Sequence, residues 1–153
     1  MNKAKDDYIK ALEASADTLQ RIVGDHILPE PLDSAGWKRV MSDPNFNAKW
    51  SLVFPVEALR GRAKSLRRND VKKGDWPPFR PEDATQAMDS IEYIRMTAQA
   101  WSSDKKFVDG IVGALKPMSD VVQKHGVQKD GVWRFRDQDA DPMPKWNPPP
   151  AGT

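Results

Sequence analysis

The segment PEDATQAMDSIEYIRMTAQAW, residues 81–101, gives the clearest indication of the fold. Its apolar residues recur at spacings of three and four, which places them along one side of an α-helix. Pro81 suits the first helical position, and Glu82 and Asp83 suit the first turn, where the helix dipole favours negative charge. We therefore predict an amphipathic helix that begins at Pro81. Its apolar stripe consists of Ala84, Ala87, Ile91, Ile94, Ala98 and Trp101.

Two earlier segments show the same spacing. The first spans residues 3–23 and should stop at Gly24, because prolines follow that prevent its continuation. The second begins at Pro55, where a missing backbone N–H is harmless, and ends near Arg68. Both segments predict amphipathic helices that bury one side.

A last helical segment follows residue 101. Ser102 or Ser103 should cap its start, and the apolar rhythm continues to the pair His125-Gly126. Pro117 lies inside this segment and should kink or split it. The short connection to the preceding helix predicts an antiparallel helical hairpin.

The stretches between and after these helices are less regular. Residues 34–41 suit a short helix, residues 50–54 suit either the start of the next helix or a short extended piece, and residues 72–80 suit a loop. A turn is expected at 129–131, then an edge strand or extended arm at 132–136.

These segments together predict an all-α protein, a small bundle of four or five helices with an extended proline-rich C-terminal arm. The bundle domain should cover residues 1–126. The arm and a flexible proline-rich tail should cover residues 127–153, because that part is rich in Asp, Asn and Pro.

Composition narrows the class of protein. The chain has 153 residues, 39% of them hydrophobic, and no cysteine, which excludes a disulfide scaffold, a thiol nucleophile and thiolate zinc sites. No apolar stretch has the length of a membrane helix, and the first residues lack the apolar centre of a signal peptide. We expect an intracellular, cytoplasmic protein that makes no contact with a membrane.

Basic charge is concentrated in one part of the chain. The whole chain has a net charge of only +2, but residues 55–81 hold eight basic and three acidic side chains. The segments before and after are slightly acidic, and residues 127–153 are balanced. One predicted helix and its following loop therefore carry the whole basic excess.

This basic segment predicts a binding surface. On a helical wheel Arg60, Lys64, Arg67 and Arg68 lie next to the apolar stripe, so a helix docked on the core presents all four on one side. Cations in a row neutralise phosphates, and aromatic rings stack on unpaired bases. The loop adds basic residues and two interleaved aromatic residues. These are Lys72, Lys73, Arg80, Trp76 and Phe79.

The same segment has other interpretations. A basic helix face is often only solvated, or it docks against the acidic segments of its own chain or against a partner protein. Trp76 and Phe79 stand beside two prolines and could equally pin the loop onto the core. Exposed rings would favour nucleic acid, and buried rings would favour an electrostatic face alone.

The arm carries a second set of candidate residues. Trp133, Phe135 and Trp146 lie in a segment that cannot bury its own apolar area, and such residues are natural anchors in a partner's groove. The alternative is that the arm folds back on its own bundle. For Trp133, partner binding and packing on its own bundle are equally good interpretations. For Trp146, partner binding is favoured.

Motifs for catalysis or metal binding are absent from the sequence. Residues 137–141 resemble the start of a calcium loop, but prolines occupy its sixth and twelfth positions. Gly110 and Gly113 have the spacing of a nucleic-acid clamp, but helix packing explains them better. His26 and His125 are far apart in sequence and lack nearby carboxylate clusters. We therefore predict no catalytic residue, no metal site and no cofactor.

Two functions are the leading hypotheses, and an enzyme with an unrecognised pair of carboxylates in a deep apolar pocket is a third, weaker one. The first is a non-catalytic subunit of a larger complex that binds nucleic-acid backbone, with low sequence specificity, through its basic face. The second is a protein-interaction adaptor or inhibitor, of the phage or mobile-element type, that uses the basic face on an acidic protein surface. In both, the C-terminal arm docks on a protein partner.

Overall fold

The computed structural model describes residues 2–26, 46–68 and 78–142, together with the single positions 35, 38 and 42. Of residues 25, 26 and 46–50 it describes the backbone alone. These parts contain five α-helices and one β-hairpin. Their bounds are α1 (Lys3–His26), α3 (Phe46–Arg67), α4 (Glu82–Trp101), α5 (Lys105–Ala114), α6 (Lys116–His125), β1 (Gly126–Lys129), β2 (Val132–Phe135) and a short 3₁₀-helix, η1 (Asp137–Asp139).

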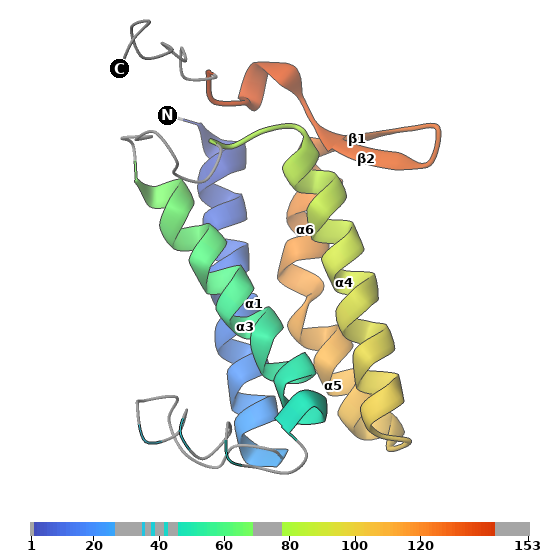
Figure 1. Cartoon of the computed structure of the whole chain (residues 1–153). Helices are drawn as coiled ribbons and strands as arrows, with labels where there is room; N and C mark the ends of the chain where they lie inside the picture. The colour runs from blue at the N-terminus through green and yellow to red at the C-terminus, as the bar shows by residue number, and fades with distance from the viewer. Residues whose placement is uncertain are drawn as a thin grey trace, which may run out of the picture.

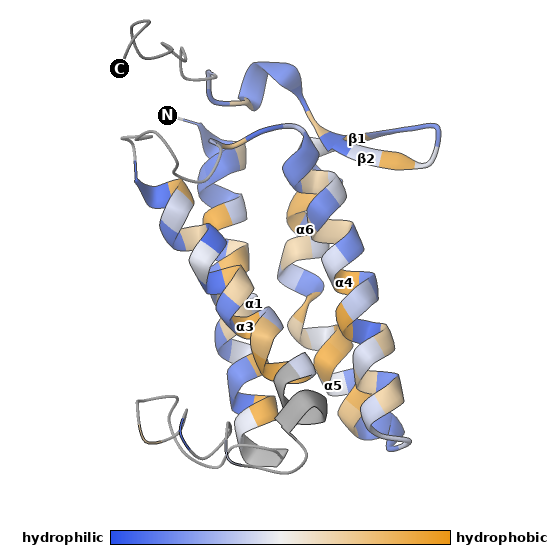
Figure 2. Ribbon diagram, in the orientation of Figure 1, coloured by the Kyte–Doolittle hydropathy of each residue, from blue (hydrophilic) through white to orange (hydrophobic). Residues whose placement is uncertain are grey.

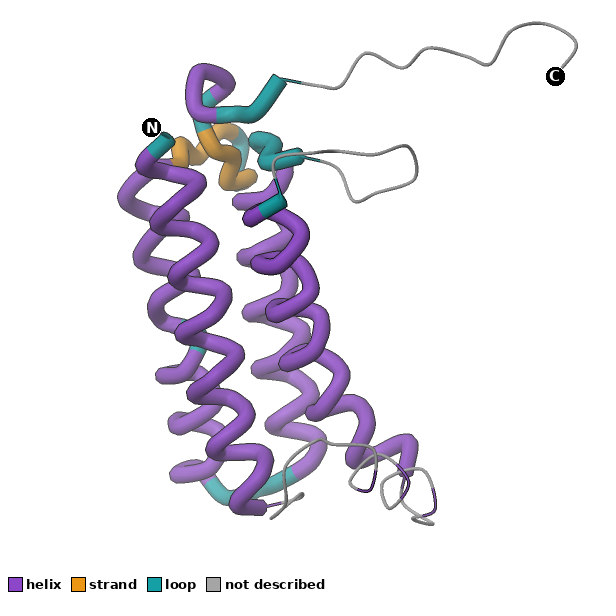
Figure 3. Tube along the Cα trace, turned by 90° about the vertical axis from the view of Figure 1, so that its left-hand side faces the viewer, coloured by secondary structure: helices purple, strands orange, loops and turns teal. Residues whose placement is uncertain are grey.

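The helices form a bundle in which α1 packs against α3 on one side and α6 on the other (Figure 1). The second half of the bundle is made by α4 and the collinear pair α5 and α6, and α3 closes the ring by packing on α4. The hairpin lies across the end of the bundle at which α1 begins, as Figure 3 also shows. The all-α bundle that the sequence predicts is therefore confirmed, with a small hairpin added.

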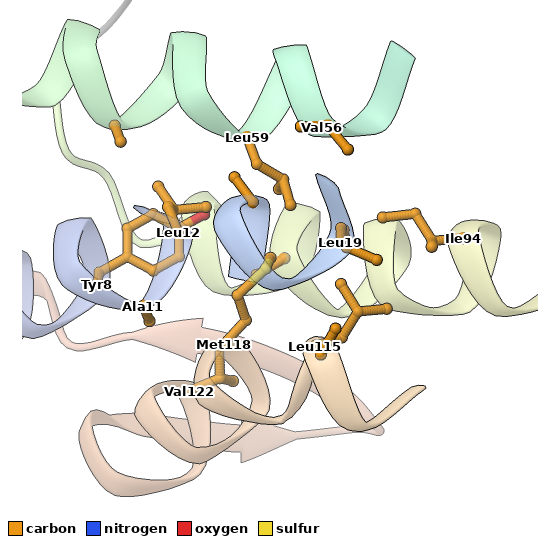
Figure 4. Close-up of a cluster of buried hydrophobic side chains, with 14 of the residues drawn as sticks. Tyr8, Ala11, Leu12, Leu19, Val56, Leu59, Ile94, Leu115, Met118 and Val122 are labelled. Carbon is orange, nitrogen blue, oxygen red and sulfur yellow. The ribbon is translucent and has the colours of Figure 1, made fainter. Parts of the chain in front are cut away.

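The apolar stripes of the helices meet in one continuous core. Along each helix, hydrophobic and hydrophilic residues alternate with the helical repeat (Figure 2). In the close-up, Leu12 and Leu19 of α1 lie between Leu59 of α3 and Met118 of α6 (Figure 4). Because α1 packs against α3, α5 and α6, its stripe joins the two halves of the bundle. No helix in the described ranges is long and apolar enough to cross a membrane.

Two predicted helix ends are wrong. Helix α3 begins at Phe46 and contains Pro55 inside it, and α1 continues through Gly24 to His26. A proline within a helix removes one backbone hydrogen bond and costs about 3 kcal/mol. Leu52 and Val53, one turn before the proline, are buried in the core. Their burial keeps the turn before Pro55 helical, so residues 50–54 belong to the helix.

The predicted break at Pro117 is confirmed. Helix α5 ends at Ala114 and α6 begins at Lys116, with Pro117 in the first turn of α6. Asp104 rather than Ser102 or Ser103 caps α5, because its carboxylate accepts a hydrogen bond from the Lys106 N–H at 3.0 Å. Helix α5 returns along α4, as an antiparallel helical hairpin requires.

The predicted turn at 129–131 connects the two strands of the hairpin. Asp130 and Gly131 have φ values of 53° and 79°, the left-handed values that a two-residue type I′ turn needs at both positions. Lys129 pairs with Val132 across the turn in an antiparallel register. The strand alternative for residues 132–136 is therefore confirmed for Val132–Phe135.

The described part of the predicted arm is not extended away from the bundle. Phe135 is buried in the core, and its N–H donates to the Pro81 carbonyl at 3.0 Å. Farther on, the Asp141 N–H donates to the Phe79 carbonyl at 2.9 Å, and its carboxylate lies 2.6 Å from the Lys5 ammonium. The hairpin and the segment up to Asp141 therefore pack on the bundle, beyond residue 126, where the sequence analysis places the end of the bundle domain.

A buried ion pair joins α3 to the start of α4. Arg62 donates from Nε and Nη2 to the two carboxylate oxygens of Asp83 at 3.0 and 2.8 Å. Asp83 also accepts the Arg80 N–H at 2.8 Å, and Arg62 donates to the Pro78 carbonyl at 3.2 Å. Both side chains are largely buried. The pair therefore ties three parts of the chain together at this end of the bundle.

We expect Asp83→Ala to destabilise the protein by about 3–5 kcal/mol, because it leaves the Arg62 guanidinium buried without its carboxylate. Urea unfolding followed by circular dichroism measures this change. Glu92→Ala is the matched control, since Glu92 also pairs with an arginine, Arg95, but on the exposed surface of the same helix. Equal losses of stability in the two variants would contradict the structural role of the buried pair.

One buried hydroxyl allows an opposite prediction. Ser15 of α1 is fully buried, and its Oγ makes no hydrogen bond to any of the described residues. Ser15→Ala removes this unsatisfied group and raises helix propensity, so we expect a gain in the free energy of unfolding of up to about 1 kcal/mol. The reciprocal change at the equally buried neighbour, Ala16→Ser, should cost about 1–3 kcal/mol. Thermal and urea unfolding of both variants would reveal the opposite signs.

Candidate interaction surfaces

Two of the predicted cationic residues turn towards α1. Arg60 donates from Nη2 to Asp17 Oδ1 at 2.9 Å and also to the Gln20 side chain. Arg67 makes a two-pronged contact with the carboxylate of Glu13. The antiparallel packing of α1 and α3 places these acidic residues opposite the arginines. Arg60 and Arg67 therefore have carboxylate partners within the chain.

Glu13 also affects the proton affinity of its partner. Its hydrogen bond and its negative charge raise the pKa of the Arg67 guanidinium above its ordinary value. This pair is exposed to solvent, so it adds little to stability. It does place a negative charge in the middle of the surface that the sequence predicts to be basic.

The other two predicted cationic residues of α3 point outward. Lys64 is exposed, and so is Arg68, which directly follows the last residue of the helix. Neither forms an ion pair with another residue in the described parts of the chain. Three more predicted residues, Lys72, Lys73 and Trp76, lie outside the described residues.

The two predicted residues at the end of the loop serve the fold. Phe79 is completely buried, with its ring centroid 5.8 Å from that of Tyr8 and 5.0 Å from that of Phe135. The expectation that Phe79 stacks on a base is therefore wrong, and its alternative role in the core is correct. The Arg80 side chain donates to the Asp141 carbonyl at 2.9 Å and so holds the returning C-terminal segment.

Two of the three residues predicted to anchor a partner, Trp133 and Phe135, pack against the core of their own chain. Phe135 is buried, and Trp133 packs against the core while its carbonyl accepts a hydrogen bond from Thr85 Oγ1 at 2.6 Å. For both residues the fold-back alternative is correct, and the partner-binding role of Phe135 is wrong. Trp146 and the short helix predicted at 34–41 fall in the parts that the structure does not describe, single positions aside.

Only one of the two glycines with the spacing of a nucleic-acid clamp has a packing role. A Cβ added to Gly110 would meet Ile22 of α1 at 3.6 Å, so this glycine lies at a helix contact, whereas Gly113 faces open space. Asp89 and Glu92 are exposed on α4. Among the described residues there is no group of three or more His, Asp or Glu side chains arranged to hold a metal ion.

His125 meets a carboxylate that the sequence analysis does not associate with it. Its Nε2 lies 2.8 Å from Asp7 Oδ2, so the end of α6 is bonded to the start of α1. This hydrogen bond, helped by the charge of Lys124, lowers the pKa of Asp7 below its ordinary value. This contact between one histidine and one carboxylate connects the C-terminal end of α6 to the N-terminal part of α1.

An apolar hollow lies between α3 and α4, and sequence reasoning misses it. Its volume is about 260 Å³, and the aromatic residues Phe54 and Tyr93 stand at its edge. The walls come from helices some thirty residues apart in sequence, so no local pattern indicates it. The residues that define it here are Phe54, Ala58, Leu59, Asp89, Ser90 and Tyr93, and we name it the α3–α4 groove.

No protein-family model, curated protein or solved structure matches this chain.

The Asp7–His125 contact predicts a pH dependence. Because folding lowers the pKa of Asp7, the ionised carboxylate stabilises the protein above the unfolded pKa of about 4, and this contribution disappears as the pH falls through the lower folded pKa. Asp7→Asn should therefore lower the urea midpoint at neutral pH, and the difference from the natural protein should shrink below about pH 4.

The control for this experiment is Asp109→Asn, which changes an exposed carboxylate on α5 that makes no ion pair with another described residue. Its effect on the midpoint should be small at every pH. A difference between Asp7→Asn and the natural protein that stays constant from about pH 6 to about pH 3 would contradict the assignment.

Proposed function

We propose that this protein is a non-catalytic protein-interaction module that docks on an acidic protein surface through Lys64 and Arg68. The observation that supports this most is the division of the basic residues on α3. Arg60, Arg62 and Arg67 are held by carboxylates of the same chain, whereas Lys64 and Arg68 point outward. Two exposed cations beside neutralised pairs form a patch of mixed charge.

This mixed patch suits a protein better than nucleic acid. A polyphosphate backbone is best matched by a continuous row of cations, and Glu13 and Asp17 interrupt that row with negative charge. The buried position of Phe79 removes one of the two rings that would stack on bases. Protein interfaces, in contrast, have a polar, solvent-accessible rim around an apolar centre, and a patch of mixed charge suits such a rim.

The tail adds a second element to the proposal. Beyond Asp141 the sequence continues with Trp146 among prolines and ends in Asn-Pro-Pro-Pro-Ala-Gly-Thr. Proline-rich segments that favour polyproline II dock in aromatic-lined grooves, and Trp is among the residues that contribute most to binding at protein interfaces. Since Phe135 is committed to the core, Trp146 takes the role of partner anchor that the arm as a whole has in the sequence-based hypothesis.

Binding of nucleic-acid backbone stays as a second candidate, because Lys64 and Arg68 lack ion-pair partners among the described residues. In the sequence, Lys72 and Lys73 follow a few residues later. The arginine pairs with α1 are exposed, so phosphates could compete for Arg60 and Arg67.

The double variant Lys64→Glu, Arg68→Glu should weaken binding of a labelled Glu- and Asp-rich peptide by about tenfold or more, because two favourable charges become repulsive. Fluorescence anisotropy measures the affinity. The control is Lys105→Glu, Lys106→Glu, which makes the same change in net charge at two exposed lysines on α5. Equal losses in both double variants would show a non-specific charge effect and contradict the proposed site.

Fluorescence anisotropy also tests the second candidate, which is binding to nucleic-acid backbone. With only two phosphate contacts, affinity for labelled DNA or RNA should fall by roughly tenfold between about 50 and about 200 mM salt. A fall of about two to three decades, abolished by reversing Arg60 and Arg67, would instead require four to six contacts and would establish nucleic-acid binding.

A further inference from the structure

The α3–α4 groove collects exposed apolar side chains. Phe54 of α3 and Tyr93 of α4 line the groove and expose 51% and 57% of their surface. Met96 does not line the groove, but it exposes 58% of its surface on α4. These three are half of the large hydrophobic residues found exposed in the described chain. Tyr93 and Met96 are three residues apart on α4, so they lie on the same side of that helix. Apolar residues gathered at one hollow, rather than scattered singly, mark interaction sites.

The groove also carries an acidic residue that has no cation within the described chain. Helix α4 contains four acidic residues, and three of them form ion pairs with arginines. Asp83 pairs with Arg62, Glu92 with Arg95, and Glu82 with Arg134. Asp89, at the edge of the groove, is exposed and pairs with none of the residues that are described. A cation brought by a partner would complement it.

The shape of the groove favours a helix as the occupant. The volume of about 260 Å³ lies below the range of pockets that enclose small molecules, roughly 300–1,000 Å³. An extended peptide would find no sheet edge there to pair with, whereas a helix satisfies its own backbone N–H and C=O groups. Ala58 and Ser90 are small and let a third helix approach between α3 and α4.

From these observations we propose that the α3–α4 groove docks an amphipathic helix of a partner protein, with apolar residues in the groove and a Lys or Arg facing Asp89. This surface is separate from the Lys64 and Arg68 patch, and it requires the opposite charge in its partner. The inference therefore goes beyond the proposed function, and either of the two can fail without the other.

A peptide titration tests the groove directly. The probe is a synthetic amphipathic helix of about 18 residues, or five turns, with leucines on one side and a single lysine beside them. Its twin carries glutamate in place of that lysine. Titrated into the ¹⁵N-labelled full chain, the lysine peptide should shift the amide signals of Ala58, Asp89, Ser90 and Tyr93, and it should bind more tightly than the glutamate peptide.

Charge exchange then tests the contact with Asp89. Asp89→Lys should weaken binding of the lysine peptide by about tenfold and strengthen binding of the glutamate peptide, because the attractive pair is restored with its signs reversed. The matched control is Asp109→Lys on α5, an exposed residue away from the groove, which should leave the preference for the lysine peptide unchanged. Ala58→Trp should weaken both peptides by filling the groove.

Three outcomes would overturn the proposal. The first is no shift at these four residues with either peptide at millimolar concentration. The second is shifts confined to residues around Lys64 and Arg68, which would assign the peptide to the basic patch. The third is a concentration-dependent dimer, seen by light scattering, in which the groove residues shift without peptide, since a second copy of the chain would then be the occupant.

Discussion

The buried pair of Arg62 and Asp83 is the contact on which the rest of this structure depends. A guanidinium and a carboxylate removed from water must satisfy each other with good geometry, and the two hydrogen bonds of 3.0 and 2.8 Å do so. Through it α3 is held against the first turn of α4. The same carboxylate receives the Arg80 N–H, so the chain entering α4 is fixed as well.

Around this pair the returning C-terminal segment is built into the core. Tyr8, Phe79 and Phe135 pack their rings together, with centroids 5.0 to 5.8 Å apart, and come from three distant parts of the chain. Burial raises the pKa of the Tyr8 hydroxyl, which stays protonated and donates to the Asp83 carbonyl at 3.4 Å. The hairpin is thus a cover over one end of the bundle. The Arg62–Asp83 pair holds α3 beside α4, the two helices that line the α3–α4 groove.

The parts of the fold that depend on local chemistry follow from the sequence. Helical stripes, the break at Pro117 and the turn at Asp130 and Gly131 are each fixed by residues within a few positions of one another. The start of α3 does not follow, because the burial of Leu52 and Val53 against distant residues outweighs the local effect of Pro55. The burial of Phe135 in the bundle does not follow from the sequence either. An apolar residue in the arm could be buried equally well in the core of its own chain or in the groove of a partner.

The prediction of the basic face from the sequence fails for the same reason, because it depends on a neighbouring helix that is distant in sequence. A helical wheel gives the direction of each side chain relative to its own axis, so it groups Arg60 and Arg67 with Lys64 and Arg68. It does not show that α1 lies beside the first two and brings Glu13 and Asp17 to them. What remains outward is a small positive patch on α3 and a carboxylate, Asp89, on the neighbouring helix. A segment suited to Lys64 and Arg68 carries negative charge, whereas a helix suited to the α3–α4 groove brings a cation to Asp89. The two surfaces therefore select segments of opposite charge.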